Sequence, residues 1–285
     1  MTLALPPASG RIVLLGAGGM LGTAMQVVLT RAGFTVDAVT RTRFDVASGR
    51  VEDLPLAGAR AVVNAAGLIN RRLATDSEAA FWLINGLFPR RLADACGRVG
   101  VPMVHISTDC VFDGATGLYW EDSAPTATDL YGRSKQFGEP ANAMVLRTSI
   151  IGPERQHFYS LLCWFLGVTD RCQGYRNHLW NGMTTLELAR IVAALIANDR
   201  VQPGLFHLHS EDVSKDQLLR LMAAAFNHAV EIDTVDDRQA KDTRLRTRHP
   251  DLLLAAQVRP LADQLAEAAQ VADRRGHWLD LPELA

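Results

Sequence analysis

A tyrosine and a lysine four residues apart have the types and spacing best suited to chemistry in this chain. Tyr131 and Lys135 stand in the segment Tyr-Gly-Arg-Ser-Lys, and Thr108 precedes them in the segment Ser-Thr-Asp. A phenol has a pKa of about 10, so it exchanges a proton near neutral pH only where a cation favours the phenolate. Residues four apart share one face of a helix, so the ammonium of Lys135 should lower the pKa of Tyr131. We predict that Thr108, Tyr131 and Lys135 deliver a proton to a carbonyl oxygen during hydride transfer.

A glycine-rich turn near the start predicts the hydride carrier, a dinucleotide. Gly16, Gly19 and Gly22 follow an apolar run over 11–15 and open a helical pattern over 20–32. Glycines at these places allow a sharp turn, a close approach of the backbone to a pyrophosphate and tight packing of the helix on the strand. The amino end of the helix then faces the phosphates.

The residues after the second predicted strand bear on which dinucleotide binds. A site for NAD usually carries an acidic residue there, which binds the ribose 2′-hydroxyl, whereas this chain carries Arg41. An arginine suits a 2′-phosphate, while Asp37, slightly earlier, is the competing observation. We predict NADP(H) as the preferred cofactor, with NAD(H) as the alternative.

Strands and helices alternate through the first half of the sequence. Buried strands are predicted over 34–39, 59–64, 102–106 and 145–149, with a long helix over about 78–99. This pattern predicts an α/β fold with a Rossmann-type doubly wound parallel sheet, in which ligands collect beyond the carboxyl ends of the strands.

The pattern changes beyond residue 150. It predicts helices over 156–166, from Thr184 or Thr185 to 196, and from a capping box at Ser214 to about 226, with an irregular stretch over 173–182 and a strand over 205–209. We predict an NAD(P)-binding domain over 1–150. A small mixed α/β substrate-binding region over 151–285 packs on it, with the chain crossing back to the first domain.

Composition excludes several classes of partner. The 285 residues are 48% hydrophobic, and 29 basic and 31 acidic residues in mixed order give a net charge of −2. This balance favours a small-molecule ligand over nucleic acid or a membrane surface. No signal peptide or membrane-spanning run is apparent, and the four cysteines lack paired spacing. We expect a cytoplasmic protein with reduced thiols and no metal site.

Several segments together resemble the extended short-chain dehydrogenase/reductases, and within them the dTDP-4-dehydrorhamnose reductase (RmlD-like) family. The likeness runs from about residue 11 to about 250. It rests on the glycine turn, on Asn-Ala-Ala-Gly at 64–67, on Ser-Thr-Asp-Cys-Val-Phe-Asp-Gly at 107–114 and on the Tyr-Gly-Arg-Ser-Lys segment. The segment Trp-Asn-Gly-Met-Thr-Thr at 180–185 departs from the family, and no counterpart of the family's metal ligands is apparent.

The resemblance implies a reductase of a nucleotide-linked 4-keto-6-deoxy sugar in polysaccharide biosynthesis, acting as a homodimer. Its substrate would be held by Thr108 and Asp109, and Trp180 is a candidate to stack on the nucleotide base. The cofactor contacts that it implies, together with those predicted above, are Gly16, Gly19, Met20, Leu21, Gly22, Arg41, Asp45, Val46, Ala65, Ala66, Gly67, Asn85, Ile106, Tyr131 and Lys135.

Two alternatives remain open. Cys110 follows the Thr-Asp pair, as a cysteine does in the similar GDP-fucose synthases, so Cys110 and His157 could also invert a sugar carbon beside the ketone in a bifunctional 3,5-epimerase/4-reductase. The chain could instead be an NADP-binding regulatory subunit without catalysis, although such a subunit should have lost Tyr131 or Lys135.

Overall fold

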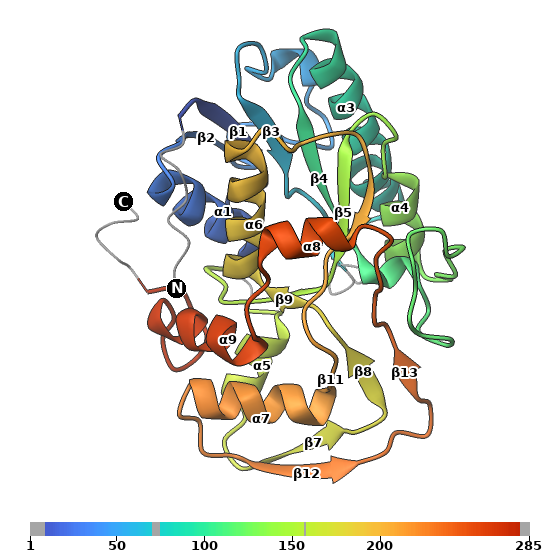
Figure 1. Ribbon diagram of the computed structural model, residues 1–285, viewed down its shortest axis with the longest axis vertical. Helices are drawn as coiled ribbons and strands as arrows, with labels where there is room; N and C mark the ends of the chain where they lie inside the picture. The colour runs from blue at the N-terminus through green and yellow to red at the C-terminus, as the bar shows by residue number, and fades with distance from the viewer. Residues whose placement is uncertain (1–8, 70–74, 157, 280–285) are drawn as a thin grey trace.

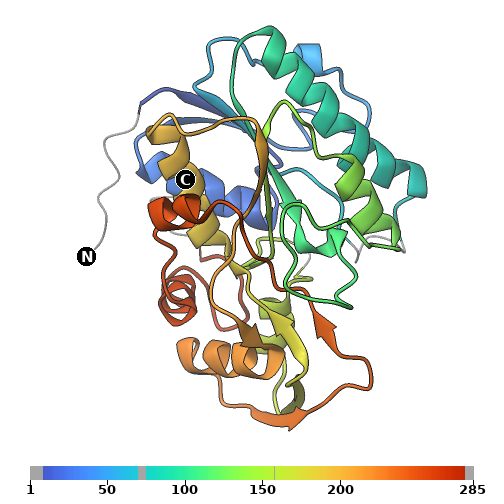
Figure 2. The same ribbon diagram turned by 45° about the vertical axis from the view of Figure 1, so that its right-hand side comes forward.

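The computed structural model describes residues 9–69, 75–156 and 158–279, which form an upper lobe around a sheet and a smaller lower lobe (Figure 1). The central sheet has six strands in the order β2-β1-β3-β4-β5-β10, and each neighbouring pair is parallel. Helices cover both of its faces (Figures 1 and 2). The prediction of a Rossmann-type parallel sheet is confirmed.

The strands are short and almost wholly apolar because both faces of the sheet are buried. In β1 the four residues 12–15 have no exposed surface. Alternate residues of the strands pack against α1 and α6 on one face and against α3 on the other. The elements of this lobe are β1 (Arg11–Leu15), α1 (Met20–Arg31), β2 (Thr35–Val39), a 3₁₀ turn (Val51–Asp53), β3 (Ala61–Asn64), α2 (Glu78–Phe81), α3 (Phe88–Arg98), β4 (Met103–Thr108), a second 3₁₀ turn (Asp109–Val111), α4 (Leu130–Phe137), β5 (Met144–Thr148), α6 (Thr185–Ala197), β10 (Gly204–His207) and α8 (Pro250–Ala256).

The lower lobe combines small sheets with helices around a separate apolar core. Leu162, Phe165, Leu219 and Leu265 are fully buried in that core. β5 leads directly into this lobe, so the carboxyl ends of the parallel strands face it. Its elements are β6 (Ile150–Ile151), α5 (Leu161–Leu166), β7 (Arg171–Tyr175), β8 (His178–Trp180), β9 (Met183–Thr184), β11 (Val213–Ser214), α7 (Lys215–Ala225), β12 (Glu231–Val235), β13 (Lys241–Asp242) and α9 (Leu261–Gln270).

Helix starts follow their capping residues. The side chain of Thr184 accepts from the amide of Glu187, and Ser214 and Gln217 form a reciprocal capping box. Both predicted caps are confirmed.

Three predicted elements differ from the structure. The helix predicted over 78–99 contains a π-helical turn at Trp82–Leu87, which its apolar period did not reveal. The helix predicted over 156–166 begins only at Leu161, where Ser160 caps it. The stretch 173–182, predicted to be irregular, contains strand β8 and most of β7, whose backbone groups pair with distant strands.

The chain returns to the upper lobe after its first passage through the lower one. Helix α6 packs on α1, strand β10 pairs with β5 at the edge of the central sheet, and α8 packs near α6. The boundary at residue 150 stays a prediction, and these elements lie beyond it.

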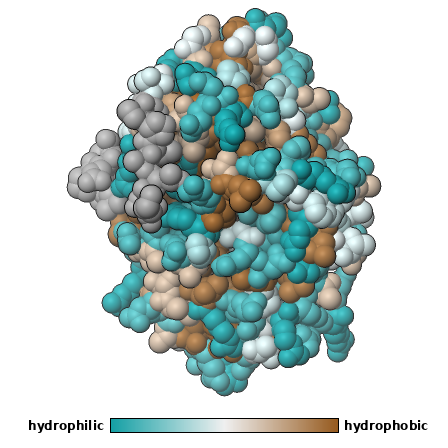
Figure 3. Space-filling view, in the orientation of Figure 1, coloured by the Kyte–Doolittle hydropathy of each residue, from teal (hydrophilic) through white to brown (hydrophobic). Residues whose placement is uncertain are grey.

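One face of the molecule is mainly hydrophilic, with an apolar spot where Figure 1 places α8 (Figure 3). Leu254 of α8 is 73% exposed. Within residues 9–69, 75–156 and 158–279, no helix is long and apolar enough to cross a membrane. The same residues contain no group of three or more His, Cys, Asp or Glu side chains that could hold a metal ion.

Candidate active site

The glycine turn packs against the end of β3. Gly16 has a φ of +76°, and a Cβ added to it would lie 2.6 Å from the amide nitrogen of Ala66. A Cβ on Gly22 would lie 2.0 Å from the carbonyl oxygen of Gly16. Only glycine therefore fits at these two positions, and the predicted cofactor residues Ala65 and Ala66 lie beside the turn.

The start of α1 can accept an anion. Gly19 is the N-cap residue, no side chain caps this helix, and its first turn, which includes Met20 and Leu21, carries no acidic residue. The first amides of a helix lack intrahelical acceptors and lie at the positive end of its dipole. This end of α1 fits the pyrophosphate of a dinucleotide.

Asn85 connects the segment after β3 to helix α4. It is fully buried in the π-helical turn, where its side chain accepts from the amide of Leu68 at 2.8 Å and donates to the Leu68 carbonyl at 3.0 Å. It also donates to Ser134 Oγ at 3.2 Å, and its Oδ1 lies 3.2 Å from the position of a Cβ on Gly67. The side chain thus holds the Leu68 backbone and the lysine-bearing helix together.

Thr108, Tyr131 and Lys135 meet at the carboxyl end of β4. The Lys135 ammonium donates to the carbonyl oxygen of Ile106 at 2.7 Å, and the Thr108 hydroxyl is near enough to the Tyr131 phenol to affect its pKa. Asp129 caps the short helix α4 by accepting from the amide of Gly132, which fixes the start of the helix that carries Tyr131. The structure brings the three predicted catalytic residues together.

The ionisation of Tyr131 and Lys135 differs from the sequence prediction. Burial raises the pKa of Tyr131, and the nearby Cys110 and Asp109 raise it further, while the Thr108 hydroxyl opposes the rise. Burial also lowers the pKa of Lys135 to about 8, and the carboxylate of Glu139 opposes that fall. The predicted lowering of the Tyr131 pKa is therefore wrong for this structure, because burial outweighs any effect of the lysine. A phenol with a raised pKa remains protonated, as a proton donor must be.

Asp109 organises the hydroxyl groups beside the phenol. Its buried carboxylate accepts from Thr108 Oγ1 at 3.2 Å, and the side chains of Ser149 and of Thr243, a residue that follows β13, are near enough to favour its ionised form. Burial raises the pKa of Asp109 despite these neighbours. The carboxylate thus lies between the end of β4 and residues of the lower lobe.

Cys110 is poorly prepared to act as a base. Burial and the charge of Asp109 raise the pKa of its thiol to about 12, and its Sγ lies 3.6 Å from Asp109 Oδ1. His157, its predicted partner, lies outside the described residues.

The loop after β2 carries the residues predicted to bind the adenosine end. The Asp37 carboxylate pairs with Arg43 and, at 3.4 Å, with Arg11, so this acidic group is already occupied. Arg41 is 73% exposed, and its Nε lies 3.9 Å from the carboxylate of Asp45. Of Asp37 and Arg41, the two side chains considered for binding the ribose end of the cofactor, Arg41 is the more accessible.

Trp180 lies in β8 and packs at the border of the lower-lobe core. Its backbone pairs with Val213, and its ring lies 2.2 Å from the position of a Cβ on Gly182. None of its described contacts joins it to Thr108, Tyr131 or Lys135, so its role in substrate binding stays a prediction.

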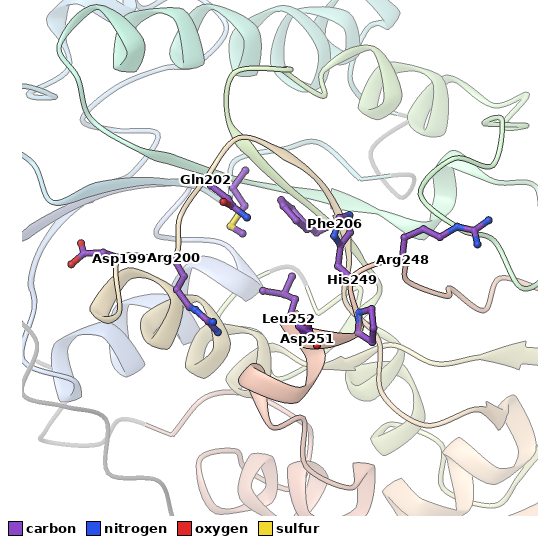
Figure 4. Close-up of a pocket in the computed structure, with 10 residues that line it drawn as sticks. Asp199, Arg200, Gln202, Phe206, Arg248, His249, Asp251 and Leu252 are labelled. Atoms are coloured by element: carbon purple, nitrogen blue, oxygen red, sulfur yellow. The ribbon is translucent and has the colours of Figure 1, made fainter.

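Two surface hollows lie apart from the catalytic trio. One of about 450 Å³ lies between the end of α6, strand β10 and the start of α8, where Arg200, Phe206 and His249 line it (Figure 4). Another, of about 420 Å³, includes Val46, the residue predicted near the adenine, together with Leu83.

Sequence reasoning missed Glu139 and Arg147. Arg147 is 3% exposed and donates two hydrogen bonds to Glu139, at 2.8 and 2.7 Å. The available signal for Glu139 was its spacing from Tyr131 and Lys135, because steps of four residues predict one row of side chains on a helix, although α4 ends at Phe137.

A family model described as the RmlD substrate binding domain matches residues 10–259. The chain belongs to this family. It is 34% identical over 152 residues to a dTDP-4-dehydrorhamnose reductase of Mycobacterium tuberculosis, and the match covers 50% of each chain. A dTDP-4-dehydrorhamnose reductase of Mycolicibacterium smegmatis is 34% identical over 215 residues, which are 72% of this chain and 65% of that protein. The matched part thus spans about half to two thirds of the length of these curated relatives.

Solved structures share the fold of this family member. The dTDP-4-dehydrorhamnose reductase of Bacillus anthracis, solved in complex with NADP, superposes with a TM-score of 0.75. The superposition covers 91% of this chain and 98% of that chain, at 20% sequence identity.

Proposed function

We propose that this chain is a reductase of a nucleotide-linked 4-keto-6-deoxy sugar that uses NADP(H) in preference to NAD(H). The observation that carries the proposal is the meeting of Thr108, Tyr131 and Lys135 at the carboxyl end of β4, at the same edge of the parallel sheet as the glycine turn that follows β1. The names of the curated relatives support the same reaction class, and the NADP complex of the Bacillus anthracis protein supports the cofactor.

The residues around the turn fit a dinucleotide. Because Gly16 and Gly22 carry no side chain, the backbone of the turn can come close to the dinucleotide. The uncapped start of α1 would receive the pyrophosphate. Arg41 would pair with a 2′-phosphate, and Lys135 would reach the nicotinamide ribose. The bound cofactor supplies the hydride for the carbonyl carbon.

The chain's own residues handle the proton. Tyr131 donates its proton to the substrate's carbonyl oxygen, which becomes a hydroxyl group, and Lys135 stabilises the phenolate that is left. Thr108 turns its O–H from Asp109 to the same oxygen. Such acid catalysis contributes about 10²- to 10⁴-fold, and the remainder of the rate comes from orienting the reactants.

The test is to incubate the purified protein with NADPH and a panel of dTDP-, UDP- and GDP-linked 4-keto-6-deoxy sugars, and to follow the loss of nicotinamide absorbance. We expect oxidation of NADPH with at least one of them. Tight binding of NADPH without turnover of any sugar would contradict the proposal and favour a regulatory subunit. Solvent deuterium at C3 or C5 of the product would identify epimerisation. We also propose that the protein is a homodimer, which light scattering would test, and that it is located in the cytoplasm.

A further inference from the structure

The buried ammonium of Lys135 has a carboxylate near it, just beyond the end of its helix. Glu139 lies four residues after Lys135, just beyond the end of α4. Its side chain is 11% exposed, and Lys135 is 5% exposed. An ammonium taken out of water loses its proton readily unless an anion lies near it. Glu139 opposes that loss at Lys135.

Two neighbouring strands hold Glu139 in place. Ser107 of β4 donates to Glu139 Oε1 at 2.6 Å, and Arg147 of β5 binds both carboxylate oxygens. Ser107 lies between Ile106, whose carbonyl accepts from Lys135, and Thr108 of the catalytic trio. Helix α4 and the residue that follows its C-cap are therefore tied to β4 at two successive residues, through Lys135 and through Glu139.

The other ionisable groups around Lys135 do not supply this charge. Tyr131, on the same helix, is neutral below its raised pKa. His105 of β4 is buried, and burial followed by the charge of Lys135 lowers its pKa well below the ordinary value, so it is neutral at pH 7. Arg147 is itself cationic, and it forms an ion pair with the carboxylate of Glu139.

We propose that Glu139 is a positioning residue of this site: its carboxylate, fixed by Arg147 and Ser107, keeps the buried ammonium of Lys135 charged. The part that this charge plays in catalysis rests on the proposed reductase function. The competing explanation is that Glu139 and Arg147 form an ion pair that only fastens the end of α4 to β5.

The titration of Lys135 distinguishes the two explanations without any substrate. The chain has only three lysines, Lys135, Lys215 and Lys241, so NMR of protein labelled with ¹³C at lysine Cε gives three signals, and Lys135→Met assigns one of them. In the wild type we expect this signal to titrate with a midpoint of about 8. In Glu139→Gln the midpoint should fall by about one unit, as expected when a nearby opposite charge is lost.

Matched variants separate charge from structure. Ser107→Ala removes a hydrogen bond to Glu139 but no charge, and Glu139→Asp retains the charge, so both should titrate closer to the wild type than Glu139→Gln does. Because Glu139→Gln leaves Arg147 buried without its partner, it can fail to fold. Glu139→Gln with Arg147→Gln replaces the whole pair by neutral groups. Its midpoint should lie below that of Arg147→Gln, because the two variants differ only in the negative charge of Glu139. Equal midpoints in these two variants would overturn the proposal.

Activity provides a second measurement. The basic limb of the kcat profile should move to lower pH by the same amount as the NMR midpoint, while KM for the sugar stays within about two-fold. A shifted midpoint in a protein that reduces none of the sugars would contradict the proposed function and leave this inference standing. An unshifted midpoint in an active enzyme would overturn only the inference.

Discussion

The two lobes place their charged side chains in different environments. In the upper lobe Asp109, Lys135, Arg147 and Glu187 are less than 9% exposed, and each has a hydrogen-bonding partner. In the lower lobe the pair Arg171–Glu231 is more than half exposed on both sides. Burial strengthens electrostatic interactions and shifts pKa values, whereas water screens exposed pairs. The buried charged groups of the upper lobe, which include Asp109 and Lys135 of the candidate site, should therefore contribute more to activity and stability than the exposed pair of the lower lobe.

The largest expected effect comes from removing the proton donor of the upper lobe. Tyr131→Phe should lower kcat by about 10²- to 10⁴-fold, because the phenol hydroxyl is lost while the ring is retained. The measurement is NADPH oxidation with the best sugar of the panel. The same change on the lower lobe, Tyr175→Phe, should leave kcat within about two-fold. Full activity of Tyr131→Phe would contradict this division of roles.

Buried and exposed ion pairs should differ in their contribution to stability. Glu187 of α6 accepts from Arg190 at 2.5 Å and from Arg259 at 2.7 Å, and its side chain is 0% exposed. Breaking a buried pair from one side costs about 3 kcal/mol, so Glu187→Gln should lower the free energy of unfolding by that amount. Urea denaturation at pH 7 measures it.

The exposed pair is the matched control, and pH is a second test. Glu231→Gln should cost no more than about 1 kcal/mol. Burial raises the pKa of Glu187, but Arg190 and Arg259 lower it by a larger amount. The net shift of the pKa is therefore downward. A lowered pKa means that this stabilisation is present above pH 4.5 and is lost as the pH falls through the folded-state pKa. Equal losses for the two variants would refute the contrast between the lobes.

The glycine turn should tolerate no side chain. Gly22→Ala would place a Cβ 2.0 Å from the Gly16 carbonyl oxygen, and relieving such overpacking costs about 1–3 kcal/mol. We expect NADPH affinity to fall at least ten-fold, measured by nicotinamide fluorescence. Gly97→Ala on α3 is the control, because its Cβ would meet nothing closer than 3.9 Å and alanine favours the helix. Similar affinities for both variants would argue against a dinucleotide at this turn.

The smallest predicted effect concerns the choice of cofactor. Arg41→Ala should weaken NADPH about ten-fold, which corresponds to about 1.4 kcal/mol, and leave NADH unchanged. NADH serves as the control within the same protein, since it lacks the 2′-phosphate that Arg41 would bind. Equal losses for both cofactors would mean that Arg41 acts on the loop and not on the phosphate.

Local patterns in the sequence were enough to predict much of the fold. Strand β1, the glycine turn and helix α1 follow one another directly between residues 11 and 31, and the Thr184 and Ser214 caps depend only on residues three positions away. The strands of the stretch 173–182 were missed because their pairing partners lie up to about sixty residues along the chain. The π-helical turn around Asn85 was missed because its period differs little from that of an α-helix.

For the site, the sequence alone determined which groups are present and that Tyr131 and Lys135 share one face of a helix, since residue type and helical spacing are local properties. Only the tertiary structure decided their ionisation. Burial at the end of β4 raises the pKa of Tyr131 and lowers that of Lys135, and the carboxylate that opposes the second shift is held by Ser107 and Arg147 from two different strands. Desolvation depends on every segment that packs around a group, so no spacing along the chain could have predicted it.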